Sequence, residues 1–151
     1  MLENRIPPPV IGLLCALLMW TSAPHVAPVI AKDSLRLAGA AAFALAGIAV
    51  DIAGILSFRA ARTTVNPLQP DRASSLVVRG IFRYSRNPMY LGMALVLVAW
   101  AVWLARPLLL LGVVAFVLYM NRFQIAPEER AMARIFGEDY VEYRRRVRRW
   151  L

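Results

Sequence analysis

Residues 89–123 read MYLGMALVLVAWAVWLARPLLLLGVVAFVLYMNRF, which is two apolar runs joined by Arg106-Pro107. The runs cover residues 89–105 and 108–123, and each approaches the length at which an α-helix crosses the hydrocarbon core of a bilayer. Because proline interrupts a helix and so few residues separate the runs, we expect an antiparallel helical hairpin. The polar segments before and after the hairpin should therefore meet at its open end.

Two more apolar stretches precede the hairpin, which predicts about four transmembrane helices in all. The first covers residues 10–30, with a break at Pro24 and Pro28, and the second covers residues 35–58. A signal peptide ending near Ala23 is the alternative interpretation of the first stretch.

The second stretch combines small residues with one charge. Gly39, Gly47 and Gly54 are spaced for close packing against a neighbouring helix. Asp51 lies among them, and an ionisable group inside a membrane segment is a functional candidate. The alternative, which the sequence leaves open, is a carboxylate that reaches the interface or pairs with an arginine of the next loop.

Composition supports a membrane protein. Hydrophobic residues make up 60% of the 151 residues and the mean hydropathy is +0.55, against roughly half apolar residues in soluble domains. At this length we expect one all-α integral membrane domain, residues 1–151. The single cysteine, Cys15, and single histidine, His25, exclude a disulfide within the chain and argue against a metal site.

The net charge of +9 is concentrated at the ends of the apolar runs and in the tail. This distribution is typical of a membrane protein beside anionic headgroups, so we expect no nucleic acid partner. The arginine-rich loop 59–88, interrupted at Asn66-Pro67, is predicted to be cytoplasmic by the positive-inside rule. Four spans then leave both termini cytoplasmic, as expected for a bacterial inner-membrane protein.

A C-terminal amphipathic helix is predicted over residues 127–149, bent at Gly137. Its apolar side chains recur at helical spacing on one face: Met132, Ile135, Phe136, Tyr140, Tyr143 and Val147. Anchoring to headgroups explains the basic end of this helix. It does not explain Glu128 and Glu129.

The open end of the hairpin should gather polar and aromatic side chains into a pocket. Its expected members are Phe82, Tyr84, Tyr90, Arg83, Arg86, Asn87, Glu128 and Glu129, with Gly80 and Gly92 allowing close backbone approach. Arginine suits a carboxylate, glutamate suits hydroxyls or an amine, and aromatic faces suit a sulfonium. An aromatic belt with positive-inside residues is the simpler explanation of the same residues.

Ordered sequence blocks add a resemblance over about the C-terminal half. RNPMYLG (residues 86–92) is followed by the hairpin, Glu128-Glu129, FGEDY (136–140) and YRRRVRRW (143–150). This order resembles the isoprenylcysteine carboxyl methyltransferase and phospholipid methyltransferase superfamily. The resemblance implies that the cofactor is S-adenosylmethionine. It also implies that the methyl acceptor is a membrane lipid or a molecule linked to a prenyl group or another lipid.

Together with the residue chemistry, the resemblance defines a predicted site. The cofactor-binding residues are Gly80, Tyr84, Arg86, Asn87, Pro88, Tyr90, Leu91, Glu128 and Glu129. Glu129 and Arg86 are the predicted catalytic residues: the first as base or acceptor-orienting group, the second as holder of an anionic group.

The acceptor stays open between a carboxyl group and an amine. The prenylcysteine branch usually has histidine at the position of Asn87, so the sequence Asn-Pro-Met-Tyr here is similar to the phosphatidylethanolamine branch. The Phe-Gly-x-x-Tyr-x-x-Tyr tail, by contrast, is similar to prenylcysteine-like bacterial members. Two other functions are retained: a nicotinamide-dependent reductase related to sterol reductases, and a basic membrane protein that only binds anionic lipid or a partner.

Overall fold

The computed structural model describes residues 3, 5–29, 32–61 and 75–151. Most of them are helical and none lies in a strand, which confirms the predicted all-α fold. In chain order the elements are α1 (Pro8–Ser22), η1 (Ala23–His25), α2 (Asp33–Ala60), η3 (Gly80–Arg83), α3 (Pro88–Trp103), η4 (Pro107–Leu109), α4 (Leu110–Tyr119), η5 (Met120–Ile125) and α5 (Ala126–Arg146).

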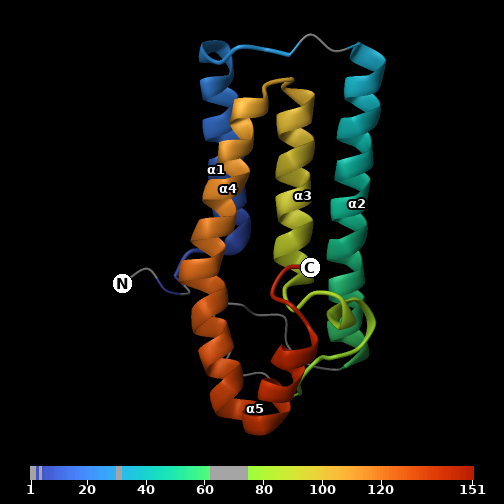
Figure 1. Ribbon diagram of the computed structural model, residues 1–151, viewed down its shortest axis with the longest axis vertical. Helices are drawn as coiled ribbons and strands as arrows, with labels where there is room; N and C mark the ends of the chain where they lie inside the picture. Colours follow the sequence, from blue (N-terminus) through green and yellow to red (C-terminus); the bar gives the residue numbers. More distant parts are fainter. Residues whose placement is uncertain (1–2, 4, 30–31, 62–74) are drawn as a thin grey trace.

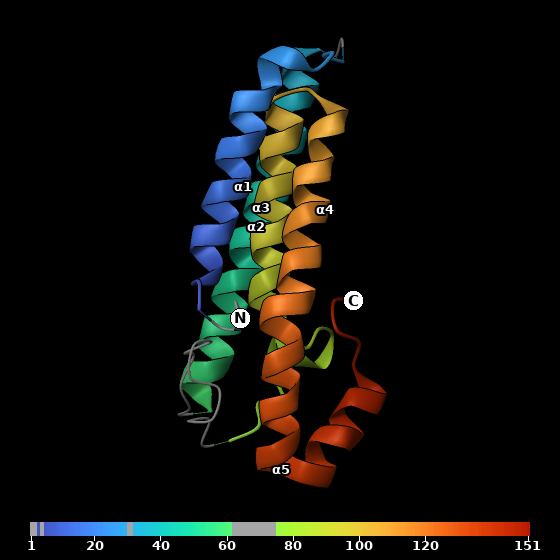
Figure 2. The ribbon, with the colours of Figure 1, turned by 90° about the vertical axis from the view of Figure 1, so that its left-hand side faces the viewer.

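Helices α1 to α4 lie side by side as an elongated bundle, and α5 extends beyond one end of it (Figure 1). The start of α1, the start of α3 and the end of the chain all lie toward that end. In the perpendicular view α5 runs past the bundle and then turns back toward it (Figure 2).

Helices α2 and α3 approach each other closely because glycines lie at their contact, as expected. A Cβ at Gly47 would meet the carbonyl oxygen of Gly92 at 2.7 Å, and one at Gly54 would meet Cγ of Met89 at 2.9 Å. Asp51 lies in the same interface, where its carboxylate occupies the space that a side chain at Gly92 would need. Its Oδ1 is buried and has no hydrogen-bond partner among the described residues.

The opposite side of the bundle forms the main hydrophobic core. Phe116, Met120 and Ile125 are fully buried there, and the indole N–H of Trp100 on α3 donates to the Ala16 carbonyl of α1 at 3.1 Å. Helix α1 therefore packs against both α3 and α4.

The outer surface of the bundle is apolar, as a protein surrounded by lipid requires. Leu13, Leu45 and Leu118 are between 62% and 71% exposed. Among the described residues, two helices are long and apolar enough to cross a membrane: α2 and the helix over Pro107–Arg146. Their most apolar windows are only 11% and 28% buried. Such exposed apolar faces are not those of core helices in a soluble domain.

The last helix departs from the expected break between residues 108–123 and 127–149. The chain passes from α4 into α5 without interruption through the π-helical turn η5. A π-turn widens the helix and spaces the ring of Pro127 from the preceding turn, so proline does not end the helix. Gly137 has φ 51 and ψ −124 and bends α5, as predicted, and α5 ends at Arg146 rather than at residue 149.

The loop predicted over 59–88 is described only at its two ends. Helix α2 continues to Ala60, and η3 occupies Gly80–Arg83. Residues 62–74, with the predicted break at Asn66-Pro67, lie outside the described residues.

Candidate functional site

An arginine and a glutamate from opposite sides of the hairpin form a buried ion pair. Nη2 of Arg86 lies 3.0 Å from Oε1 of Glu129, and the two side chains are 10% and 11% exposed. Arg86 stands just before α3, while Glu129 stands in the first turn of α5. Their contact confirms that the polar segments flanking the hairpin meet.

The neighbouring glutamate pairs with a tyrosine. The hydroxyl of Tyr90 donates to Oε1 of Glu128 at 2.5 Å, and Tyr90 is buried near the start of α3. The pKa of Glu128 is raised to about 8, chiefly by burial; the hydrogen bond from Tyr90 opposes the rise and the nearby charge of Glu129 adds to it. Two adjacent acids thus have different surroundings.

The C-terminal tail, residues 147–151, supplies a second cation to the site. Nε and Nη2 of Arg149 donate to the two oxygens of Glu129 at 3.1 and 2.5 Å. Nη1 of Arg149 and the indole N–H of Trp150 also reach Oδ1 of Asn121 in η5, at 3.4 and 3.0 Å. The tail therefore ties the end of the chain to the π-turn.

Backbone contacts hold the tail against the segment before α3. The amide of Arg86 donates to the carbonyl of Arg148 at 3.0 Å, and Nδ2 of Asn87 donates to the carbonyl of Arg149 at 2.9 Å. Ser85, which is buried, accepts a hydrogen bond from the amide of Asn87. Asn87 thus positions the tail, although it stands at the start of α3 and makes no side-chain cap there.

The folded-back part of α5 rests on η3. The hydroxyl of Tyr143 donates to the carbonyl of Phe82 at 2.7 Å, and the ring of Phe82 meets Phe58 of α2 edge to face. Tyr140 is also buried, and burial with the charge of Glu129 raises its pKa to about 12. Gly137 makes these contacts possible because it reverses the helix.

Comparison with known proteins identifies the family of the chain. A family model described as phospholipid methyltransferase matches residues 35–139, well over half of the chain. The chain belongs to the phospholipid methyltransferase family. An uncharacterised protein of Haemophilus influenzae is 49% identical over 63 residues, which are 42% of this chain and 100% of that protein. No solved structure is significantly similar to the chain.

Membership of the phospholipid methyltransferase family confirms the resemblance read from the sequence blocks. The family match extends from α2 through the bend of α5, so it includes Arg86, Tyr90, Glu128 and Glu129. The tail that carries Arg149 lies beyond the matched residues.

The other predicted site residues lie in three different settings. Pro88 and Leu91 belong to the first turns of α3, where Pro88 is buried and near Gly54 of α2. Gly80 has φ +62 and stands against the hydroxyl of Ser57. Tyr84 is 70% exposed and makes no hydrogen bond with the two glutamates.

Sequence reasoning did not assign Ser85, Asn121, Arg149 or Trp150 to this site. The run of arginines near the end of the chain favoured a headgroup anchor, because charge alone cannot distinguish Arg149 from its neighbours. The distinction comes from the bend at Gly137, which directs the tail back over the start of α3.

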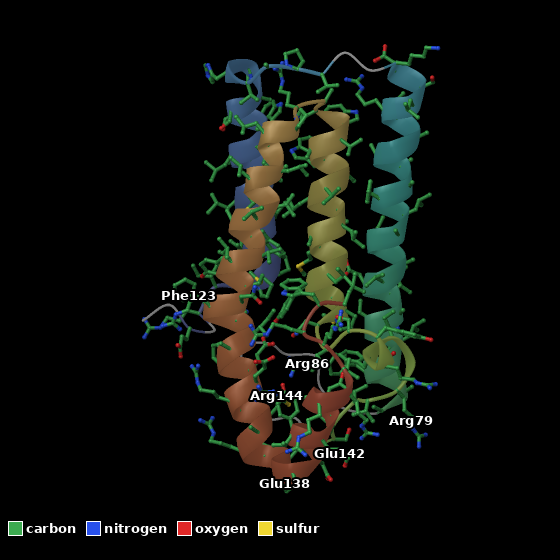
Figure 3. All side chains as sticks on the ribbon, in the orientation of Figure 1. Arg79, Arg86, Phe123, Glu138, Glu142 and Arg144 are labelled. Atoms are coloured by element: carbon green, nitrogen blue, oxygen red, sulfur yellow. The ribbon has the colours of Figure 1, made fainter. Side chains whose placement is uncertain are left out.

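Unpaired polar atoms remain in the site. Nε and Nη1 of Arg86 are buried without a hydrogen-bond partner among the described residues. Buried donors of this kind carry a cost unless an acceptor is supplied. In Figure 3, Arg86 lies between α5 and the tail, whereas Arg79 and Glu138 lie at the edge of the molecule.

Proposed function

We propose that this chain is an S-adenosylmethionine-dependent membrane methyltransferase whose acceptor is a lipid-borne amine. Family membership supports methyl transfer and a lipid substrate. The observation that supports the cofactor is the guanidinium of Arg86, which is 10% exposed and leaves Nε and Nη1 without a partner in the described chain.

The chemistry of the residues fits S-adenosylmethionine. A carboxylate is a strong acceptor for a guanidinium, and the carboxylate of the cofactor could accept from an unpaired nitrogen of Arg86. Among the described residues, Glu128 accepts only from the neutral hydroxyl of Tyr90, so its ionised form would supply negative charge for the amine or sulfonium of the same molecule. When bound, the cofactor supplies a methyl group activated by the positive sulfur.

The protein's part is mainly alignment and exclusion of water. Arg86 and Glu129 hold each other, and the tail adds Arg149 to the same carboxylate. These contacts would fix the orientation of the Arg86 and Glu129 side chains toward the cofactor. The buried rings of Tyr90, Tyr140 and Tyr143 make the surroundings dry.

Glu128 is the better candidate for the base. Both oxygens of Glu129 accept hydrogen bonds from arginine, so a base role there would require Arg149 to move away. Glu128 has a pKa of about 8, and only its Oε1 accepts the hydrogen bond from Tyr90, so its second oxygen is not used in that contact. An ammonium acceptor must lose a proton before methylation, and a group that titrates near neutral pH can take it. We assign the orienting role to Glu129.

A lipid acceptor requires that the site lie at a membrane surface. We propose that α1, α2, α3 and the apolar part of the last helix span the bilayer, with both termini and the site on the cytoplasmic side. The apolar outer surface of all four helices supports this arrangement.

Calorimetric titration of the detergent-purified protein with S-adenosylmethionine tests the proposal. We expect saturable binding that is weakened about tenfold or more in Arg86→Lys, because an ammonium cannot pair with Glu129 and still present the fixed donors of a planar guanidinium to the cofactor. Glu129→Gln should also weaken binding. Arg79→Lys and Glu138→Gln are the matched controls, since both residues are exposed, and each should bind within about twofold of wild type.

A second measurement follows transfer of a labelled methyl group into lipids extracted from membranes, with Glu128→Gln expected to lose turnover even at concentrations of S-adenosylmethionine that saturate the variant. Absence of saturable S-adenosylmethionine binding by the folded wild type would contradict the proposal. Saturable binding of NADPH in its place would favour the reductase.

A further inference from the structure

A cavity of about 290 Å³ opens at the end of the bundle opposite the candidate site. Trp20 from the end of α1, Arg36 from the start of α2, and Trp103 and Arg106 from the α3–α4 turn contribute to its walls. Helix α3 begins at the candidate site and ends here, so its 16 residues separate the two by about 24 Å.

The cavity is positively charged. Arg36 and Arg106 line it, and no acidic residue of the described chain does. Nη1 of Arg106 donates to the carbonyl of Val26, a neutral acceptor, and Arg106 makes no ion pair with a described residue. Nη2 of Arg36 pairs with Asp33 at 3.0 Å, but Asp33 is 83% exposed and outside the cavity wall.

Hydrogen-bond donors in the wall are also unused. Nε of Arg36 is buried and has no partner among the described residues. The indole N–H groups of Trp20 and Trp103 likewise make no hydrogen bond within the described chain. A ligand for this cavity must therefore bring acceptor atoms and negative charge.

The surroundings indicate an amphiphile. Leu35, Leu108 and Leu111, from the neighbouring helix ends, are 58% to 71% exposed. Acyl chains would cover such residues in a bilayer. The cavity lies at the small end of the range for ligand sites, roughly 300–1,000 Å³, which suits a phosphate group with its glycerol but no larger body.

We propose that this cavity binds the phosphodiester headgroup of an anionic phospholipid. Arg36 and Arg106 face the phosphate, the two indoles border the glycerol, and the acyl chains run along the exposed leucines. This site is separate from methyl transfer and does not depend on it.

Native mass spectrometry of the full chain in mild detergent tests the assignment, with dioctanoyl phosphatidylglycerol as the probe. We expect saturable binding of one lipid per chain, weakened about tenfold in Arg36→Gln because a charge-assisted contact is lost. Lys32→Gln removes the same charge from an exposed residue at the same end and should stay within twofold of wild type. Asp33→Asn should tighten binding, since it releases Arg36.

Three results would overturn the proposal. One is equal binding by wild type and Arg36→Gln. Another is equal weakening by Lys32→Gln, which would indicate diffuse attraction to the basic surface. The third is displacement of the lipid by an equal concentration of inorganic phosphate, which would make the cavity a site for the free ion.

Discussion

Glu128 and Glu129 are neighbours in sequence but differ in their partners. Glu129 accepts from Arg86 and Arg149, whereas Glu128 accepts from the neutral hydroxyl of Tyr90. Burial without a cation is what raises the pKa of Glu128 to about 8 from an ordinary 4.5. The folded protein thus binds more protons than the unfolded chain between these two pH values. Glu128 therefore lowers the free energy of unfolding as the pH rises through this window.

The same shift makes cofactor affinity depend on pH. A cation bound beside Glu128 favours its ionised form, so binding below pH 8 must release a proton. We expect the affinity for S-adenosylmethionine to rise between about pH 6 and 8, by up to roughly tenfold per pH unit, and to level off above pH 8. Calorimetry in buffers of different ionisation enthalpy measures both the affinity and the protons released.

Glu128→Gln is the decisive comparison, because the amine of the cofactor also titrates near this pH range. The variant should lose the part of the pH dependence that belongs to the protein. Identical profiles for wild type and variant would show that Glu128 does not take part.

At the scale of the elements, the pairing of α2 with α3 depends on Gly92. Tyr90 and Gly92 are two residues apart, so they point to nearly opposite sides of α3. Tyr90 meets Glu128, and Gly92 meets Asp51 and Gly47. Asp51 therefore lies on the side of α3 away from the two glutamates, within a helix contact.

Gly92→Ala should destabilise the bundle by about 1–3 kcal/mol, the usual cost of overpacking. The new Cβ would overlap the Asp51 carboxylate and lie 2.7 Å from the carbonyl oxygen of Gly47. Adding Asp51→Ala should restore only part of the stability, because the backbone oxygen remains. Thermal unfolding in detergent measures both changes.

Gly12→Ala is the control for this experiment. A Cβ at Gly12 would find its nearest atom, in Phe116, at 3.9 Å, so stability should stay the same or rise slightly with helix propensity. Equal stability of Gly92→Ala and Gly12→Ala would mean that the glycine contact does not control helix packing.

For the molecule as a whole, charge distinguishes the two ends of the bundle. The site end carries Arg79, Arg83, Arg86 and the arginines of the tail, while the other end carries Lys32, Arg36 and Arg106. The excess at the site end favours a cytoplasmic location for it.

Cysteine labelling in intact cells tests this orientation. In a Cys15→Ser background, Lys32→Cys should react with a membrane-impermeant maleimide, whereas Asp139→Cys should react only after permeabilisation. Both positions are exposed, so access of the reagent depends on the side of the membrane alone. Labelling of Asp139→Cys in intact cells would reverse the proposed orientation.

Much of the helical frame could be predicted from local patterns. Long apolar runs and the Arg106-Pro107 break predict helices and a tight turn regardless of what surrounds them. Gly39, Gly47 and Gly54 predicted a close helix contact because small residues matter only where another backbone approaches. The junction at Pro127 was predicted less well, since a π-turn has no short sequence signature.

The sequence by itself determined that the chain is helical, apolar on its outside, and polar at the open end of its hairpin. It also determined which family blocks occur and in which order, because these properties depend on residue type and spacing. Only the tertiary structure decided which polar residues pair with one another. Arg149 reaches Glu129, and Asp51 lies away from it, because the bend at Gly137 and the rotation of α3 bring distant residues together or apart. Pairing in space depends on helix direction and packing, which no local pattern specifies.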